Sequence, residues 1–127
     1  MIQSYMDLDV YHRSMDVLVE VHQLLHKFPA YELNELCSQM RRASKSIPCN
    51  IAEGYGKKRS VKEFVSYLAI AMGSANEMVV HLEVSSRLGY IPGDVSKRLQ
   101  EEYNIIGKML NRLSQRWIKS DESSVKC

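Results

Sequence analysis

Apolar residues spaced three and four positions apart run through this chain in four long segments, and this spacing constrains the fold more than any other feature. The last segment is the clearest, with a seam formed by Val95, Leu99, Tyr103, Ile106, Leu110, Leu113 and Trp117. A period near 3.6 places such residues on one side of an α-helix, and alternation by four and three suits helix bundles. The 127 residues include only six glycines and three prolines, which leaves little turn chemistry for an all-β fold. We therefore predict an all-α chain.

Turn signals divide the chain into four helices. Pro29 ends the first helix, and Gly54 and Gly89 are expected to be left-handed caps after the second and third. Ser60 and Glu63 match a capping box that starts the third helix. The expected helices cover residues 8–27, 31–53, 61–88 and 94–119. Short connections between them predict an up-and-down antiparallel four-helix bundle in a single domain, residues 1–120, followed by a frayed polar tail, residues 121–127.

Two features of the apolar pattern point to close packing or self-association. The first helix carries more apolar surface than one core face needs, in two sets: Leu8, Tyr11, Met15, Leu18 and Leu25, and Val10, Val17, Val21, Leu24 and Phe28. A helix that is apolar on two sides is either central in its domain or also covered by another subunit. The band of the second helix, from Leu33 through Ile51, continues past Pro48 without a change of phase. Gly73, inside the third helix, suggests close approach of a neighbouring helix.

Several functional classes receive no support from the sequence. The chain has no run of eighteen apolar residues and no secretory signal at its start, so we expect a cytoplasmic protein that makes no membrane contact. Cys37, Cys49 and Cys127 are an odd number without a Cys-x-x-Cys pair, and we expect reduced thiols. His22 and His26 lie four apart but lack a third ligand. No metal or other cofactor is expected.

A polar stripe follows the apolar band of the second helix. It consists of Arg42, Ser46, Asn50 and Glu53, and the third helix offers Ser74 and Glu77 as partners. We favour a structural interpretation, in which Arg42 neutralises one or both carboxylates and the smaller groups complete a hydrogen-bonded network. The alternatives are that the network faces a neighbouring subunit, or that Glu53 and Glu77 form an acid–base pair in a small hydrolase. No nucleophile or phosphate-binding loop accompanies that pair.

Positive charge gathers where the second and third helices meet. Residues 41–62 contain seven basic residues and one acidic residue, whereas residues 63–127 contain eight of each. Basic residues near an aromatic ring are typical of surfaces that contact a nucleic-acid backbone. The candidate residues are Lys45, Lys57, Lys58, Arg59 and Lys62, with Tyr55 as a stacking surface. The alternative is that these cations form an ordinary solvated surface.

Residues 39–54, QMRRASKSIPCNIAEG, and residues 71–77, AMGSANE, carry a family resemblance, together with Phe28-Pro29 and Leu88-Gly89-Tyr90. The chain resembles the bacterial 23S rRNA intervening-sequence proteins over most of its length. The resemblance implies a four-helix bundle that assembles as a ring-like homopentamer. It also implies remote similarity to the accessory protein of diversity-generating retroelements, which binds nucleic acid and a reverse transcriptase. Lys57-Lys58-Arg59 is more basic than the Gly-Arg pair expected after the glycine.

Taken together, these observations predict a non-enzymatic oligomeric scaffold that contacts the backbone of RNA or DNA, or holds a nucleic-acid enzyme such as a reverse transcriptase. The alternative is a protein-interaction or structural oligomer that binds no nucleic acid. The hydrolase that would use Glu53 and Glu77 is a third hypothesis.

Overall fold

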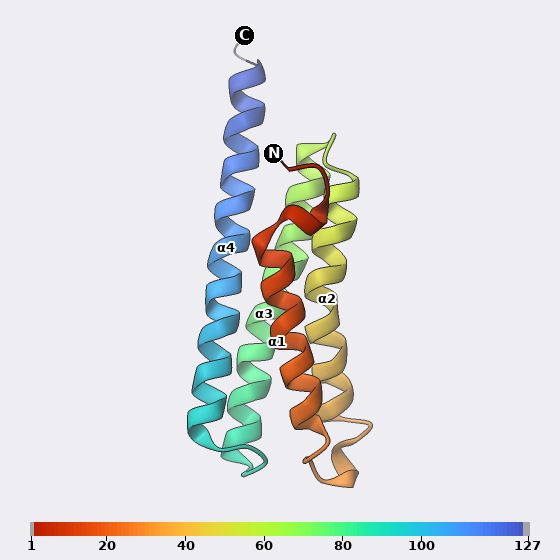
Figure 1. Cartoon of the computed structure of the whole chain (residues 1–127), viewed down its shortest axis with the longest axis vertical. Helices are drawn as coiled ribbons and strands as arrows, with labels where there is room; N and C mark the ends of the chain where they lie inside the picture. The colour runs from red at the N-terminus through yellow and green to blue at the C-terminus, as the bar shows by residue number, and fades with distance from the viewer. Residues whose placement is uncertain (1, 126–127) are drawn as a thin grey trace.

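A computed structural model of the chain describes residues 2–125, with side chains described through Glu122. Four α-helices make up this part of the chain, and it contains no strand. In chain order the elements are the 3-10 helix η1 (Tyr5–Asp7), α1 (Asp9–Leu25), the 3-10 helix η2 (Ala30–Glu32), α2 (Leu36–Gly56), α3 (Val61–Arg87) and α4 (Gly93–Val125). Successive helices run in opposite directions (Figure 1), so the predicted all-α bundle is confirmed.

The core lies along the axis of the bundle and draws on all four helices. Each helix packs against the next, and α1 also packs against α4, which closes the bundle. The largest fully buried side chains are Val21, Met40, Ile47, Ile51, Phe64, Leu68, Met78, Leu82, Leu99, Tyr103, Ile106 and Leu110. They come from the apolar stripes that the spacing predicts, because three- and four-residue steps keep a side chain on the same face of a helix.

Helix α1 buries one of its apolar faces and leaves part of the other outside. Val10, Val17 and Val21 are buried, whereas Tyr11 and Leu18 are half-buried and Met15 is 37% exposed. The latter three residues line an open groove between α1 and α2, together with Pro48, Cys49 and Ala52. The excess apolar surface expected from the sequence is therefore present on the outside of a single chain.

The start of α2 differs from the prediction. The chain after Pro29 first forms η2, in which Glu32 N–H donates to Pro29 O (3.0 Å) and Leu33 N–H donates to Ala30 O (3.1 Å). A 3-10 helix has about three residues per turn instead of 3.6, so it shifts the phase of the apolar band. Leu33, expected in the core, is consequently 55% exposed, and the α-helix begins only at Leu36.

The glycine that permits close helix approach is Gly54, not Gly73. Helix α2 continues through Gly54 to Gly56, so Gly54 is not the expected left-handed cap. A Cβ built on Gly54 would lie 2.7 Å from Tyr67 Cβ and 3.2 Å from Phe64 Cδ1, whereas one on Gly73 would meet nothing within 4 Å. Gly89 does adopt a left-handed backbone, with φ +81°, and the predicted cap of α3 is confirmed there.

Helix α4 is longer than predicted. It begins at Gly93 and continues to Val125, so residues 121–125 belong to the helix. Neither glycine nor proline interrupts this stretch, and the helix is anchored just before it, because the Trp117 ring packs edge-on against Phe64 at 4.7 Å between centroids. The remainder of the predicted tail, including Cys127, lies outside the described residues. Within the described part of the chain, every helix is too short or too polar to cross a lipid bilayer.

Candidate nucleic-acid interface

The turn between α2 and α3, with the first turn of α3, holds four exposed cations: Lys57, Lys58, Arg59 and Lys62. We call this region, residues 57–62, the α2–α3 joint. Its backbone is fixed by three turn hydrogen bonds, from Lys57 N–H to Gly54 O, Lys58 N–H to Tyr55 O and Ser60 N–H to Lys57 O. Ser60 Oγ accepts from Glu63 N–H at 3.2 Å, which caps α3. The reciprocal half of the predicted capping box is replaced by the turn bond of Ser60 N–H.

Tyr55 does not present the stacking surface that the sequence suggested. Its side chain is only 6% exposed, and its ring packs edge-on against Phe64 and Trp117. The ammonium group of Lys58 lies 3.9 Å from the centroid of the Tyr55 ring, a cation–π contact that covers the ring from outside. Tyr55 therefore positions a cation and cannot stack on a base.

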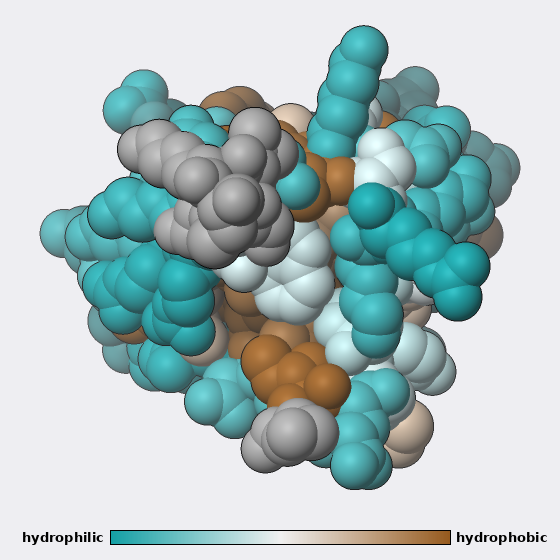
Figure 2. Space-filling view, turned by 90° about the horizontal axis from the view of Figure 1, so that it is seen from above, coloured by the Kyte–Doolittle hydropathy of each residue, from teal (hydrophilic) through white to brown (hydrophobic). Residues whose placement is uncertain are grey.

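Lys57 is also held in place, while its neighbours stay free. Lys57 Nζ donates to the Tyr67 hydroxyl at 2.8 Å and lies 5.0 Å from the centroid of that ring. The hydrogen bond raises the pKa of Lys57, so its positive charge is retained. Among the described residues, Arg59 and Lys62 have no carboxylate within ion-pair distance. The α2–α3 joint thus presents fixed and free cations side by side. Figure 2, which looks onto this end of the molecule, shows hydrophilic side chains around its rim.

Lys45 belongs to a different surface. It precedes Lys57 by twelve residues, or about 18 Å of helix at 1.5 Å per residue. Its side chain lines the α1–α2 groove beside Tyr11 and Leu18. The structure therefore separates Lys45 from the other four candidate cations.

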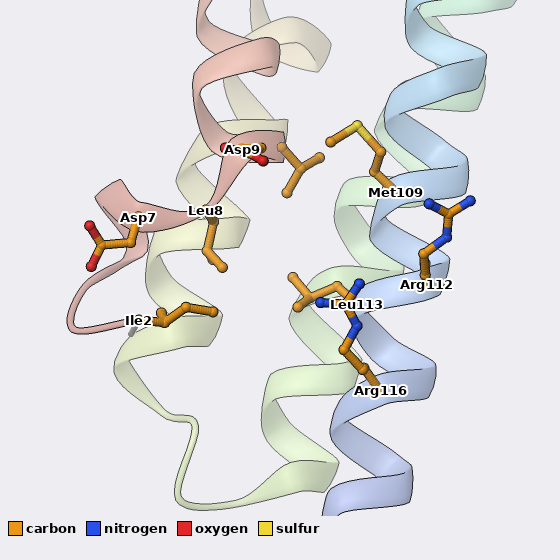
Figure 3. A pocket seen from close by; sticks show the side chains of 9 residues that line it. Ile2, Asp7, Leu8, Asp9, Met109, Arg112, Leu113 and Arg116 are labelled. Carbon is orange, nitrogen blue, oxygen red and sulfur yellow. The ribbon is translucent and has the colours of Figure 1, made fainter.

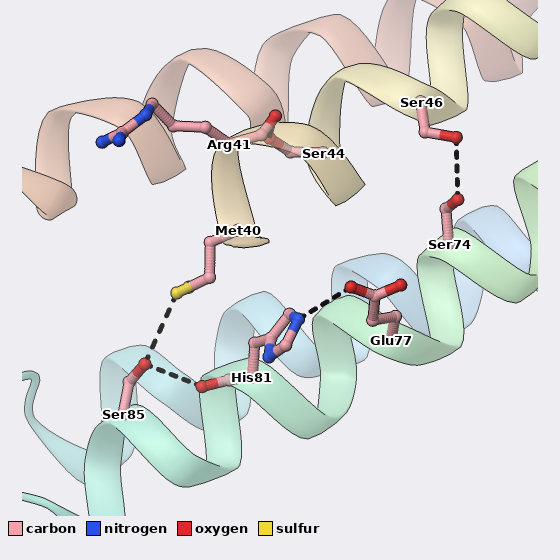
Figure 4. A network of polar contacts seen from close by, with 8 residues as sticks. All are labelled: Met40, Arg41, Ser44, Ser46, Ser74, Glu77, His81 and Ser85. Carbon is pink, nitrogen blue, oxygen red and sulfur yellow. Dashed lines mark hydrogen bonds and ion pairs between the residues drawn. The ribbon is translucent and has the colours of Figure 1, made fainter. Parts of the chain in front are cut away.

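Three residues of the predicted polar stripe meet between α2 and α3. Ser74 Oγ donates to Ser46 Oγ at 2.9 Å, a contact visible in Figure 4. Asn50 Nδ2 donates to the same Ser46 Oγ at 2.9 Å and to Ser46 O at 2.7 Å. All three side chains are half-buried, so their mutual hydrogen bonds satisfy polar groups at the edge of the helix interface.

The charged members of the stripe stay outside this network. Arg42, Glu53 and Glu77 are exposed, and Glu77 pairs with His81 at 2.9 Å instead of with Arg42. Arg42 and Glu77 border a shallow pocket with Ser46 and Ser74, but no ion pair of Arg42 is present among the described residues. The expected neutralisation by Arg42 is therefore wrong. Long charged side chains at an interface margin can extend into water, whereas the shorter serine and asparagine side chains stay beside the helix contact.

Glu53 and Glu77 do not form a pair. Gly54, next to Glu53, packs against Tyr67, while Ser46 packs against Ser74. Glu77 follows Tyr67 by ten residues on α3, which is about 15 Å along the helix. Two carboxylates this far apart along the bundle are not arranged for acid–base work on one bond.

A second group of cations lies on α4 and is not apparent from the charge balance of residues 63–127. Residues 103–120 contain four basic residues and no acidic ones: Lys108, Arg112, Arg116 and Lys119. All four are exposed, and their spacing of four, four and three places them on one side of α4. Arg112 and Arg116 border a pocket between α4 and the start of α1 (Figure 3). The charge balance of the whole helix hides this group too, because α4 holds six basic and five acidic residues, and only a count over a shorter segment such as residues 103–120 reveals it.

The histidine and cysteine side chains that the structure describes lie in different environments. His22 Nε2 lies 3.3 Å from Ser44 Oγ, and partial burial, followed by Lys45, Arg41 and His26, lowers the pKa of His22. Cys37 is buried, which raises the pKa of its thiol, and Cys49 is exposed in the α1–α2 groove. Within the described residues, no three His, Cys, Asp or Glu side chains gather as metal ligands would.

Comparisons with known proteins found a matching family and a similar solved structure. A model of the family described as 23S rRNA-intervening sequence protein matches residues 6–112. The chain is similar to a solved protein of unknown function from the S23 ribosomal protein family of Bacteroides thetaiotaomicron VPI-5482. The TM-score is 0.72 and the sequence identity 28%, over 84% of this chain and 95% of that chain. No protein with a curated description matches the sequence.

Proposed function

The chain belongs to the 23S rRNA-intervening sequence protein family, and from that premise we propose that it is a non-enzymatic scaffold that binds the backbone of nucleic acid, RNA above all. The α2–α3 joint is the proposed contact surface. The family description names 23S rRNA and the similar protein of unknown function belongs to the S23 ribosomal protein family, and this association with the ribosome supports RNA as the ligand. A cytoplasmic location follows from the same association.

The exposed cations of the α2–α3 joint are the observation that carries the proposal. Arg59 and Lys62 are free of carboxylate partners among the described residues, while Tyr67 and Tyr55 hold Lys57 and Lys58 in fixed positions. A rigid turn with such cations suits phosphate groups, whose recognition does not depend on base sequence. The contact should therefore follow the shape and charge of the nucleic acid.

A scaffold also requires self-association or a second partner. The α1–α2 groove exposes Met15 beside Tyr11 and Leu18, and this apolar surface supports an assembly of several chains. We propose a ring-like homopentamer, in which the α2–α3 joint would occur five times. Such a ring would present the cations repeatedly to one nucleic acid or to a nucleic-acid enzyme bound on it, for which a reverse transcriptase is the proposed example. The separation of Glu53 from Glu77 supports a role without catalysis.

Salt-dependent binding tests the proposal. Lys57, Lys58 and Arg59 are replaced together by alanine, and binding to a fluorescent RNA hairpin is measured by anisotropy at several salt concentrations. Each lost phosphate contact should reduce the slope of log K against log salt by about one, so we expect a reduction of about two to three with weaker binding at every salt concentration.

A matched control removes the same charge elsewhere. Lys27, Arg87 and Lys97 are exposed near the opposite end of the bundle, and replacing them by alanine should leave most of the slope intact. Equal effects of the two triple variants would contradict a specific role for the α2–α3 joint. Absence of binding by the unaltered protein at low salt would favour the alternative, an assembly that works only through protein contacts at the α1–α2 groove.

A further inference from the structure

The basic side of α4 consists of Lys108, Arg112, Arg116 and Lys119, and we call it the α4 stripe. It is distinct from the α2–α3 joint, because Trp117 faces the aromatic cluster beneath that joint. Lys119 follows Trp117 by two residues, which is about 200° around a helix with 3.6 residues per turn. The α4 stripe therefore points away from the joint. It runs from Lys108, which borders a pocket with Met72 and Asn76 near the middle of α3, toward the end of the bundle that carries the joint (Figure 1).

The cations of the α4 stripe differ from three arginines elsewhere in the bundle, which are paired with acidic side chains. Arg13, Arg87 and Arg98 are held by Glu102, Glu83 and Glu20 respectively. Among the described residues, no such ion pair involves the stripe. Acidic side chains share two pockets with the stripe: Glu101 lines the pocket that Lys108 borders, and Asp7 and Asp9 line the pocket that Arg112 and Arg116 border. Asp7 Oδ2 accepts from the N–H groups of Gln3 and Ser4. These backbone bonds lower the pKa of Asp7 and engage its Oδ2 at the turn of η1.

The dimensions and neighbours of the α4 stripe fit a double helix. From Lys108 to Lys119 the stripe is about 16 Å long at 1.5 Å per residue, close to the rise of five base pairs at about 3.4 Å each. Asn111 and Gln115 are exposed between the cations, and their amide groups can donate to phosphate or sugar oxygens.

A single strand, by contrast, is usually bound by stacking its bases on aromatic rings. The aromatic rings at this end are engaged with one another: Phe64 is buried, Tyr55 is nearly so, and Trp117 packs on both. We infer that the α4 stripe is a second nucleic-acid surface, which follows the backbone of a double-stranded segment. This inference extends the proposed function and rests on it.

The experiment uses a duplex RNA and one of its strands as probes. Arg112, Arg116 and Lys119 are replaced together by glutamine, with the triple glutamine variant of Lys27, Arg87 and Lys97 as a control of equal charge. We expect the stripe variant to lose about two units of salt slope and at least about tenfold in duplex affinity, whereas the control keeps both. The unaltered protein should bind the duplex at least about tenfold more tightly than the single strand, because Tyr55, Phe64 and Trp117 pack on one another at this end and do not offer their faces to bases.

Titrating the triple variant of Lys57, Lys58 and Arg59 in parallel distinguishes failure of the second surface from failure of the proposed function. If the joint variant weakens binding and the stripe variant behaves like its control, the second surface is excluded and the proposed function stands. If only the stripe variant weakens binding, the contact lies on α4 and the joint is excluded. Equal or tighter binding of the single strand overturns the assignment to a double helix. Absence of binding to both probes overturns both proposals. Thermal unfolding by circular dichroism verifies that every variant is folded.

Discussion

Two glycines in facing helices have opposite surroundings, and the difference predicts opposite effects of one substitution. Gly54→Ala would place a Cβ 2.7 Å from Tyr67 Cβ, in a contact that forces α2 and α3 apart. Overpacking of this kind costs about 1–3 kcal/mol, which exceeds the gain in helix propensity of at most about 1 kcal/mol. We expect the free energy of unfolding, measured with urea, to fall by about 1–2 kcal/mol.

Gly73→Ala is the matched control. Its Cβ would enter open space, so only the better helix propensity of alanine remains. We expect an increase in stability of about 0.5–1 kcal/mol. Similar effects of the two substitutions, in either direction, would contradict the assignment of Gly54 as the point of close approach.

His22 should make stability depend on pH. Its pKa is lowered from 6.5, mainly by burial and further by Lys45, Arg41 and His26. Since the unfolded chain then takes up a proton more readily than the folded one, the stabilisation is present above about pH 6.5 and is lost as the pH falls through the folded pKa. We expect an NMR titration to place His22 below 6.5, and His22→Gln to weaken the loss of stability between pH 7.5 and 5.5. A pKa above 6.5 would contradict this environment.

Single residues also show where the sequence was insufficient. The spacing of Ser46, Asn50 and Ser74 correctly brought those residues together, but the same spacing included Arg42 and Glu53, which are exposed. Helical periodicity reports the direction of a side chain around the axis. It does not report whether a long side chain bends outward to water, and that choice decides which groups form the network.

At the scale of elements, the four helices were predictable because each carries a continuous apolar stripe. The predicted helix boundaries are wrong where the backbone leaves α-helical geometry, before α2, and where a helix lacks a stop signal, at the end of α4. Glu32 and Leu33 belong to 3-10 turns that no stripe reveals, and α4 continues after Lys119 through five polar residues, 120–124, that extend no apolar stripe. Local hydrogen-bond geometry, not hydrophobic periodicity, sets these boundaries.

Helices α1 and α4 are joined across the outside of the bundle by ion pairs, which predicts a measurable coupling. Arg13 Nε donates to Glu102 Oε1 at 2.5 Å and Arg13 Nη2 donates to Oε2 at 3.2 Å, while Arg98 pairs with Glu20 on the same two helices. Both side chains of the first pair are partly exposed, so solvent screening limits the coupling to about 0.5–1 kcal/mol.

A double-mutant cycle of Arg13→Gln and Glu102→Gln, followed by urea unfolding, measures this coupling. We expect it to shrink at high salt, because ions screen partly exposed pairs. A coupling near zero at low salt would mean that the two side chains do not hold α1 against α4.

At the scale of the whole molecule, the basic α2–α3 joint could be proposed from the sequence because its cations are adjacent in the chain, and all four are exposed. The sequence did not reveal the α4 stripe, because acidic residues at the start of α4 and after Ser120 offset its charge in a total over α4 or over residues 63–127. It also grouped Lys45 with the joint, although twelve residues of helix separate it from Lys57. Net charge over a segment does not show how charges are distributed over a folded surface.

Assembly is the property of the whole molecule on which the proposed scaffold depends. The α1–α2 groove is apolar and open in one chain, so placing a charge in it should prevent another chain from covering it. We expect the unaltered protein to sediment as a species of about 73 kDa, five times the 14.6 kDa chain, and Met15→Glu to shift it to smaller species. Val80→Glu, at an exposed apolar position on α3, is the control and should leave the large species intact. Dissociation by the control but not by Met15→Glu would place the interface on α3. A monomer in the unaltered protein at micromolar concentration would remove the basis for a ring, because one chain would then keep its groove open to water.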